Sequence, residues 1–293
     1  AAAPFGGVFD GDGHAVAGFH LAAAARDDVG LFGRVSGSAA VVRNLTLSDA
    51  VVEGYSHVGI LAGWVDRAAT VSGCSTSGAA SGYEYVGGLV GVVGGDWFVG
   101  TFPAVVSASS SSATVTADYW FAGGLLAVLG GGSILANTFA TGDVAAAANY
   151  AGGLVAGAPY AALVLSSYGA GDVTAQCYSA GLVGNLGGVI VDSFAVGSVT
   201  ASSAACTEAG ALVGRTWGAS GWLITGSYSY AGASCTAPLS CHGPVAGETA
   251  VADLSTFYSA SSAPLSSWNF SSAWSARAND FPVLRSAAAG TLP

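Results

Sequence analysis

The chain has 293 residues, of which 52% are hydrophobic and 8% are charged, and its seven arginines, absence of lysine and seventeen acidic residues give a formal net charge of −10. This balance lacks the clustered cations that nucleic acid or an anionic membrane surface requires, so we expect neither as a partner. The high apolar content, with aromatic residues throughout, also argues against intrinsic disorder.

A glycine-rich phrase repeats along the chain. Clear copies occupy residues 85–91, 121–125, 150–154 and 178–184, and degenerate copies occupy residues 29–33, 58–61 and 209–214. The step between copies is 28 to 30 residues, except for one step of 36. A fixed period of this size means that each unit cannot bury its apolar face alone and stacks on its neighbours. The sequence therefore predicts an all-β fold, a parallel β-helix or β-solenoid of about eight coils with an irregular C-terminal cap.

Each repeat contains short β-prone runs separated by glycine, which predicts two or three strands per coil with glycine at the corners. We divide the chain into an N-terminal entry coil (1–27), a repeat region (28–235) and a C-terminal capping or assembly segment (236–293). Gly153 should lie at a corner, where a positive φ would exclude valine. One column inside the core is expected to hold Leu89, Leu125, Leu154 and Leu182.

Aromatic residues recur at the same period. In a parallel stack, equivalent residues of successive coils lie directly above one another. We therefore expect two aromatic ladders that stabilise the stack rather than bind a ligand. The residues of the two ladders are Tyr85, Phe121, Tyr150 and Tyr178, and then Phe139, Tyr168, Phe194 and Tyr228. Residues 144–171 carry no charge, but their glycines and Pro159 break a membrane helix, and no membrane span is expected.

The repeat resembles a known family. Residues 87–91 (Gly-Gly-Leu-Val-Gly), followed by a segment such as 137–144, are similar to the GLUG repeat of large bacterial surface proteins. These include adhesins related to filamentous haemagglutinin and non-catalytic regions of some IgA-specific proteases. Residues 9–16 resemble the phrase that often precedes such repeats, and residues 268–274 and 281–284 resemble the segment that follows them. The resemblance implies a scaffold and carries no catalytic residues over to this chain.

The cysteines favour an oxidising, extracellular or cell-surface compartment, and a chain that begins at Ala1 suits a processed secreted protein or a fragment. Cys177, Cys206 and Cys235 are spaced by 29 and 29, so we expect them at one place on three successive coils. Coils about 4.8 Å apart suit a disulfide. The favoured bridges are Cys177–Cys206 and Cys235–Cys241. Pairing of Cys206 with Cys235 and buried free thiols are the alternatives, and Cys74 is left free or intermolecular.

Two carboxylates at one repeat's distance are the candidates for chemistry. Asp143 and Asp172 should lie on adjacent coils, where they could bind Ca²⁺ or act in a polysaccharide lyase or hydrolase. Each follows a glycine, which is the usual chemistry of a turn, and we favour that interpretation for them and for the Asp10 to Gly13 stretch. The four histidines lack zinc-site spacing. We therefore predict no cofactor and no enzymatic activity.

Four tryptophans are candidates for binding. Trp97 and Trp120 lie in the longer fourth repeat, and Trp217 and Trp222 in an irregular glycine-rich segment of the eighth. Insertions in solenoids form loops, so these rings could stack on sugars or enter a neighbouring subunit, or they could cover the core. Asn44 and Asn269 begin glycosylation sequons.

The favoured function is a secreted structural or adhesive element of a cell or particle surface, because the open ends of a solenoid can join head to tail into a filament. Self-association, other surface proteins and glycans are the expected partners. The segment from Glu248 should cap the last coil or lend a strand to the next subunit. A carbohydrate-binding or carbohydrate-cleaving protein is the alternative. An ice-binding protein is the second alternative, through the column Thr138, Ser167, Ser193 and Ser227 with Thr174 and Thr200 nearby, although a regular Thr-x-Thr array is missing.

Overall fold

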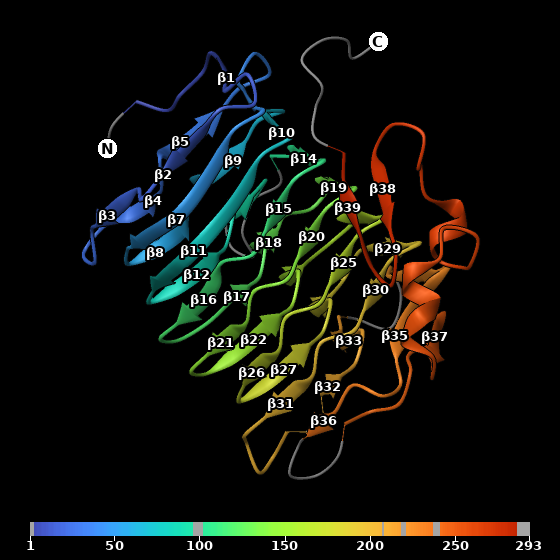
Figure 1. Ribbon diagram of the computed structural model, residues 1–293. Coiled ribbons are helices and arrows are strands. Elements are labelled where there is room, and N and C mark those ends of the chain that lie inside the picture. The colour runs from blue at the N-terminus through green and yellow to red at the C-terminus, as the bar shows by residue number, and fades with distance from the viewer. Residues whose placement is uncertain (1–2, 96–101, 207, 218–220, 237–240, 286–293) are drawn as a thin grey trace.

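A computed structural model describes residues 3–95, 102–206, 208–217, 221–236 and 241–285 (Figure 1). Over these residues the chain winds into a parallel β-solenoid whose coils stack in chain order. Seven coils contribute strands to all four sides, and part of an eighth follows. The predicted all-β solenoid is therefore confirmed.

Two sheets take up the first half of each coil. The first sheet has eight parallel strands: β1 (Val8–Asp10), β6 (Val41–Arg43), β10 (Thr70–Ser72), β14 (Val105–Ser107), β19 (Ile134–Ala136), β24 (Leu163–Leu165), β29 (Val189–Val191) and β34 (Leu223–Thr225). The second sheet has 15 strands, because most coils cross it twice: β2 (Ala15–Ala17), β3 (His20–Ala22), β7 (Thr46–Glu53), β11 (Ser75–Gly82), β15 (Ser110–Ser111), β16 (Thr114–Ala117), β20 (Phe139–Ala140), β21 (Val144–Ala146), β25 (Tyr168–Gly169), β26 (Val173–Ala175), β30 (Phe194–Ala195), β31 (Val199–Ala201), β35 (Ser227–Tyr230), β36 (Cys235–Thr236) and β37 (Glu248–Val251).

Two further sheets complete the coil, each with seven parallel strands. The third sheet contains β4 (Asp27–Val29), β8 (Ser56–Gly59), β12 (Glu84–Gly87), β17 (Ala122–Gly123), β22 (Asn149–Gly152), β27 (Cys177–Ala180) and β32 (Ala209–Gly210). The fourth sheet contains β5 (Phe32–Ser36), β9 (Ala62–Asp66), β13 (Val90–Val93), β18 (Leu126–Leu129), β23 (Val155–Ala158), β28 (Val183–Leu186) and β33 (Val213–Thr216).

The corner between the first and second sheets depends on left-handed residues. From the second coil onward φ there lies between 45° and 62°, at Asn44, Gly73, Ala108, Asn137, Ser166, Asp192 and Gly226. Glycine, asparagine and aspartate adopt this conformation most readily. The corners stay in register although successive corners are 26 residues apart between Ser166 and Asp192 and 35 apart between Gly73 and Ala108. The extra residues are therefore accommodated in loops elsewhere in the coil.

The glycine pairs lie at the corner between the third and fourth sheets, but φ at Gly153 is not positive. Glycine is required there for a different reason, because a Cβ on Gly153 would stand 2.2 Å from the carbonyl oxygen of Gly181 on the next coil. The positive φ values belong instead to the aromatic residues just before the pairs, 55° at Tyr85, 58° at Phe121 and 68° at Tyr150.

The core lies inside the four sheets and is built from columns of aliphatic residues. Leu89, Leu125, Leu154 and Leu182 form the predicted column and are fully buried. Another column follows the middle residues of the first-sheet strands: Phe9, Val42, Val71, Val106, Leu135, Val164, Ile190 and Ile224. Burial of these columns is the main force that stacks the coils.

The core also contains a ladder of hydroxyl groups. Ser167, Ser193 and Ser227 each donate a hydrogen bond to the carbonyl two residues earlier, at 2.7–2.9 Å, and accept one from the backbone of the preceding coil, at 3.1–3.2 Å. Thr138 lies in the same column, and all four residues are buried. The ice-binding column proposed from the sequence was therefore wrong, since these hydroxyl groups face the interior. Each of the three serine hydroxyls satisfies a buried amide that would otherwise lack a partner, and the Thr138 hydroxyl is hydrogen-bonded to that of Ser167.

The C-terminal segment folds back along the side of the solenoid (Figure 1). It consists of β37, two short 3-10 helices, η1 (Leu254–Tyr258) and η2 (Leu265–Ser267), and the antiparallel pair β38 (Trp274–Arg277) and β39 (Asp280–Leu284). β37 extends the second sheet beside β35, and Trp268 and Trp274 cover the ladder Phe139, Tyr168 and Phe194. The segment thus covers its own coils from the side.

The structure contains both favoured disulfides, Cys177–Cys206 with a Cα–Cα distance of 5.3 Å and Cys235–Cys241 with 6.0 Å. The prediction that three cysteines share one place was wrong for Cys235. That residue pairs with Val199 in the second sheet, whereas Cys177 lies in the third. Coil lengths vary, so equal spacing in the sequence does not give equal register. Cys74 is free and buried, and desolvation raises the pKa of its thiol to about 11.

Candidate functional site

A row of tyrosines runs along the outer corner between the second and third sheets. Tyr55, Tyr83 and Tyr119 occupy equivalent places on three successive coils, because each backbone amide donates to the carbonyl of the preceding member at 2.8 Å. Their rings stack at centroid distances of 5.0 and 5.3 Å, and Trp120 stacks on Tyr119 at 4.5 Å. We call these four residues the outer ladder. The three tyrosines are 37–44% exposed, so the ladder forms a strip of accessible aromatic surface.

The predicted ladder of the third sheet lies beside it and is more deeply buried. Tyr85, Phe121, Tyr150 and Tyr178 stack at 4.6–4.9 Å, as the repeat predicted. The Arg215 guanidinium lies 4.8 Å from the Tyr178 ring centre and 5.3 Å from that of Trp217. These rings pack mainly against one another and against side chains of the fourth sheet.

The four predicted tryptophans have different environments. Trp97 lies outside the described residues. Trp120 belongs to the outer ladder, Trp217 is exposed beside Arg215, and Trp222 packs against the core. The sequence analysis missed Tyr55 and Tyr83. Tyr83 follows Tyr55 by 28 residues and Tyr119 follows Tyr83 by 36, which are the same intervals that separate the corresponding copies of the glycine phrase. That coincidence of spacing was the available signal.

The paired carboxylates Asp143 and Asp172 lie on adjacent coils. Asp143 Oδ1 accepts a hydrogen bond from the Asp172 amide at 3.0 Å, and Asp172 Oδ1 accepts one from the Ser198 amide at 2.8 Å. Each carboxylate thus holds the turn of the following coil, which is the structural role favoured from the sequence. Within the described ranges, no group of three or more His, Cys, Asp or Glu side chains is placed to hold a metal ion.

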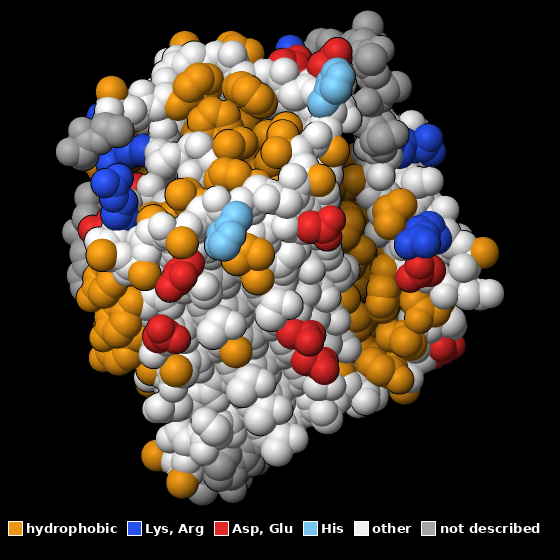
Figure 2. All heavy atoms as spheres, turned by 60° about the vertical axis from the view of Figure 1, so that its left-hand side comes forward, with side chains coloured by type: hydrophobic (Ala, Val, Ile, Leu, Met, Phe, Trp, Pro, Cys, Tyr) orange, Lys and Arg blue, Asp and Glu red, His pale blue; other side chains and the backbone are white. Residues whose placement is uncertain are grey.

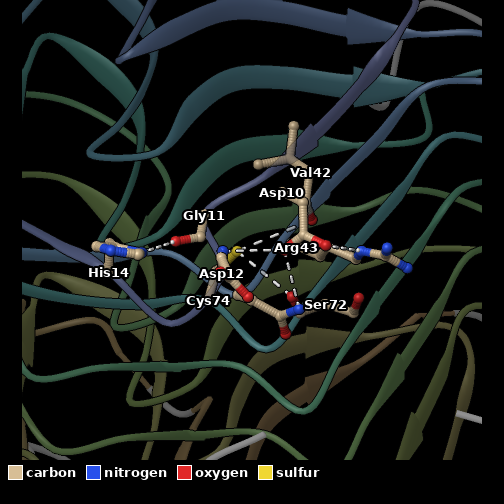
Figure 3. Close-up of polar contacts among 9 residues, drawn as sticks. Asp10, Gly11, Asp12, His14, Val42, Arg43, Ser72 and Cys74 are labelled. Atoms are coloured by element: carbon tan, nitrogen blue, oxygen red, sulfur yellow. Dashed lines mark hydrogen bonds and ion pairs between the residues drawn. The ribbon is translucent and has the colours of Figure 1, made fainter. Parts of the chain in front are cut away.

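The opening phrase forms a turn that is fixed to the second coil (Figure 3). Asp10 accepts hydrogen bonds from the Asp12 amide at 3.0 Å, Asn44 Nδ2 at 3.1 Å and Arg43 Nε at 2.8 Å. The Asp12 amide, followed by Asn44 and Arg43, holds the pKa of Asp10 below its usual value. His14 Nδ1 lies 3.0 Å from the Gly11 carbonyl oxygen.

The two glycosylation candidates differ in accessibility. Asn269 is exposed in a turn, where its side-chain oxygen accepts from Ser271 and Ser272 and its nitrogen donates to Ser272 at 2.7 Å. Asn44 is half-buried, and its side-chain nitrogen donates to Asp10. Attachment of a glycan requires access to the side-chain nitrogen, so the exposed Asn269 is the better placed of the two.

The two ends of the solenoid differ. At the N-terminal end Phe9 is 37% exposed and Val16 is 43% exposed, although their partners in the second coil, Val42 and Leu47, are fully buried. At the C-terminal end Ile224 is only 3% exposed. Figure 2, which brings the N-terminal side forward, shows hydrophobic side chains gathered near the top of the face. Among the described residues, the core is therefore more exposed at the N-terminal end, although Phe5, Phe19 and Phe32 pack against it there.

The cover at the C-terminal end comes from the partial eighth coil and from the residues that follow it. Trp222, Cys235, Cys241 and Val245 pack against the last core residues. His242 fixes part of this cover, since its amide donates to the Ala209 carbonyl at 3.0 Å and its Nε2 lies 2.7 Å from the Gly214 carbonyl oxygen. We found no helix long and apolar enough to cross a membrane in the part of the chain that the structure describes.

These features define the chain as a disulfide-bonded parallel β-solenoid with an exposed aromatic strip on its side. It is similar to halomucin of Haloquadratum walsbyi, with 39% identity over 87 residues. That match covers 30% of this chain and 1% of halomucin, so the chain spans a very small part of its relative's length.

The fold is also that of a Bacteroides ovatus protein provisionally named an immunoglobulin A1 protease. Its crystal structure superposes with a TM-score of 0.66 at 20% identity, over 96% of this chain and 77% of the other. This likeness shows the fold alone. No family model matches the chain, so the likeness to the GLUG repeat remains an interpretation of the sequence.

Proposed function

We propose that this chain is an extracellular structural and adhesive β-solenoid that takes up a further β-coil at its open N-terminal end. The observation that carries the proposal is the contrast within one core column, where Phe9 is 37% exposed and Ile224 is 3% exposed. Phe5 pairs with β5, but β1 and β4 have no outer neighbour among the described residues. An exposed core residue beside such strand edges is the usual feature of a surface that another strand layer covers.

Three observations support the extracellular part of the proposal. Two disulfides suit an oxidising compartment. The local likeness to halomucin, whose name denotes a mucin, and the resemblance to the GLUG repeats of surface proteins both agree with a secreted or surface-bound scaffold. The halomucin match covers 1% of that protein, which suits a role as one structural part of a larger assembly.

The partner that we propose is another open solenoid end, in the simplest case that of a second copy. A head-to-tail filament would also need a free C-terminal end, and there Trp222, Cys241 and Val245 cover the core. Pairing of two N-terminal ends produces a closed dimer instead, which is the commonest symmetry of self-associating proteins.

Sedimentation velocity over a range of concentrations tests this proposal, with two matched lysine substitutions. Val16 is 43% exposed at the open end, and Val51 is 44% exposed on the side of the second coil. We expect the wild type and Val51→Lys to form dimers and Val16→Lys to remain monomeric. A wild type that stays monomeric, or a Val16→Lys variant that associates normally, contradicts the proposal. The proposal includes no catalytic step.

A further inference from the structure

The outer ladder, Tyr55, Tyr83, Tyr119 and Trp120, is not required by the solenoid. At the equivalent place, the next two coils carry Ala148 and Gln176, and the same hydrogen bonds between coils continue, at 3.0 and 2.6 Å. On the preceding coil the place is taken by Arg26, whose carbonyl accepts from the Tyr55 amide at 2.7 Å. Since arginine, alanine and glutamine all fit, stacking of the coils does not explain why three tyrosines stand here.

The ladder also does little to cover the core. Its three tyrosines are 37–44% exposed, whereas Tyr85 and Phe121 in the neighbouring ladder are each 4% exposed. Both rows stack at similar distances, 5.0–5.3 Å in the outer ladder and 4.9 Å between Tyr85 and Phe121. The same ring stacking therefore occurs in a buried form and in an accessible form, and only the accessible form can contact a partner.

The arrangement of the accessible groups fits a polymer rather than a small molecule. Stacked rings expose their apolar edges and their hydroxyl groups at intervals of 5.0 and 5.3 Å along the solenoid axis. Trp120 extends the row beyond Tyr119. An extended sugar chain repeats at a comparable distance and offers both apolar C–H groups and hydroxyl groups. Tyrosine and tryptophan bind such mixed surfaces well, because they combine a rigid apolar ring with a hydrogen-bonding group.

The charges beside the ladder restrict the ligand further. Glu53, Glu84 and Asp118 lie within two residues of ladder tyrosines, and Arg26 is the cation next to the row. Desolvation, the neighbouring tyrosines and Glu84 all raise the pKa of Tyr83. The negative potential at the strip repels sulfated or carboxylated polymers and tolerates neutral ones.

We propose that the outer ladder binds an extended, uncharged polysaccharide that runs along the solenoid axis across Tyr55, Tyr83, Tyr119 and Trp120. This site lies on the side of the solenoid, on the second to fourth coils, and shares no residue with the end surface formed by Phe9 and Val16, so its binding is tested separately from the self-association proposed above. A monomer that binds polysaccharide would support this inference while contradicting the proposed dimer.

An array of immobilised polysaccharides tests the inference. The array holds uncharged glucans, mannans and chitin fragments together with carboxylated and sulfated polymers. The purified chain is compared with Tyr83→Ala, with Tyr55→Ala at the end of the ladder, and with the control Thr174→Ala on the exposed face of the second sheet. Circular dichroism and melting curves identify any variant that has lost the fold.

We expect the wild type and Thr174→Ala to bind at least one uncharged polysaccharide equally well. Truncation of the central ring in Tyr83→Ala should lower the affinity about tenfold or more, and truncation of the end ring in Tyr55→Ala should lower it by a smaller factor. Three results overturn the inference: no binding to any uncharged polymer, a preference for the anionic polymers, or unchanged affinity in the folded tyrosine variants.

Discussion

The two ends of the solenoid are built from the same repeat and end differently. Phe9 and Ile224 occupy the first and last places of one core column, yet Phe9 is 37% exposed and Ile224 is 3% exposed. Trp222, Cys241 and Val245 pack against the core, and Cys241 and Val245 follow β36, the last strand of the eighth coil in the repeat register. Each repeat buries its core face against the next repeat, but the terminal coil has no further repeat to cover it. Covering the core at the end of a solenoid therefore requires residues that are not part of the repeat.

Truncation of the first and last side chains of that core column should give the largest difference in stability between the two ends. Ile224→Ala should destabilise the protein by about 2–4 kcal/mol, because it leaves a cavity under the C-terminal cover. Phe9→Ala should destabilise it by less than half as much, since much of the ring is already in contact with water. Denaturant unfolding of both variants at a concentration that keeps the protein monomeric checks this. Equal losses would mean that the two ends are equally closed.

The disulfides give a second effect, of similar size, at the C-terminal end. Replacing Cys177 and Cys206 by serine should remove about 3–4 kcal/mol, because their bridge restricts a loop with a sequence separation of 29 residues. The Cys235–Cys241 bridge has a separation of only six and should contribute about 2 kcal/mol. Thermal melting of the two double variants measures the difference. A larger loss from the short bridge would show that it mainly prevents strain or opening of the cover.

At the N-terminal end, acid should lower the stability of the protein slightly, through protonation of Asp10. The folded-state pKa of Asp10 is lowered by the Asp12 amide, Asn44 and Arg43, so its stabilising contribution is present above the ordinary aspartate pKa. That contribution is lost as the pH falls through the folded-state pKa. Asp10→Asn should therefore be less stable than the wild type at pH 6, and the difference should shrink as the pH falls below the ordinary aspartate pKa, as measured by denaturant unfolding between pH 6 and 2.5.

Asp12→Asn is the control for that measurement, because the Asp12 carboxylate takes no part in the hydrogen bonds to the second coil. It should show no comparable convergence on acidification. If the difference between wild type and Asp10→Asn stays constant from pH 6 to 2.5, Asp10 does not stabilise the first coil through its charge.

The period of the repeat predicted the features that arise when equivalent residues of successive coils stack on one another. The leucine column, the two aromatic ladders and the Cys177–Cys206 bridge between adjacent coils all follow from the period. The outer ladder could have been found in the same way, because Tyr55, Tyr83 and Tyr119 share the period. It was missed because the tyrosines lie outside the conspicuous glycine phrase.

Other features could not be read from the spacing. Each residue of the hydroxyl ladder follows a left-handed residue, as Ser167 follows Ser166, and this residue upsets the alternation that separates inward from outward positions. Cys235 was placed wrongly because loops change the coil length, so that Val173, Val199 and Cys235 align at steps of 26 and 36 residues. The C-terminal segment has no period, so its position over Tyr168 had no counterpart in the sequence pattern.

The Cys177–Cys206 bridge also determines how the solenoid would respond to mechanical tension. A chain pulled from its C-terminus would peel away coil by coil, because each coil is held mainly by its neighbours. The bridge connects two adjacent coils directly, so the residues between its cysteines, a separation of 29, would bear no load once peeling reached Cys206. The bridge would keep about 100 Å of extended chain from contributing to the extension, and further peeling would continue from Cys177. Reduction would release that length, which makes the redox state of one bond a control on how far this scaffold can stretch.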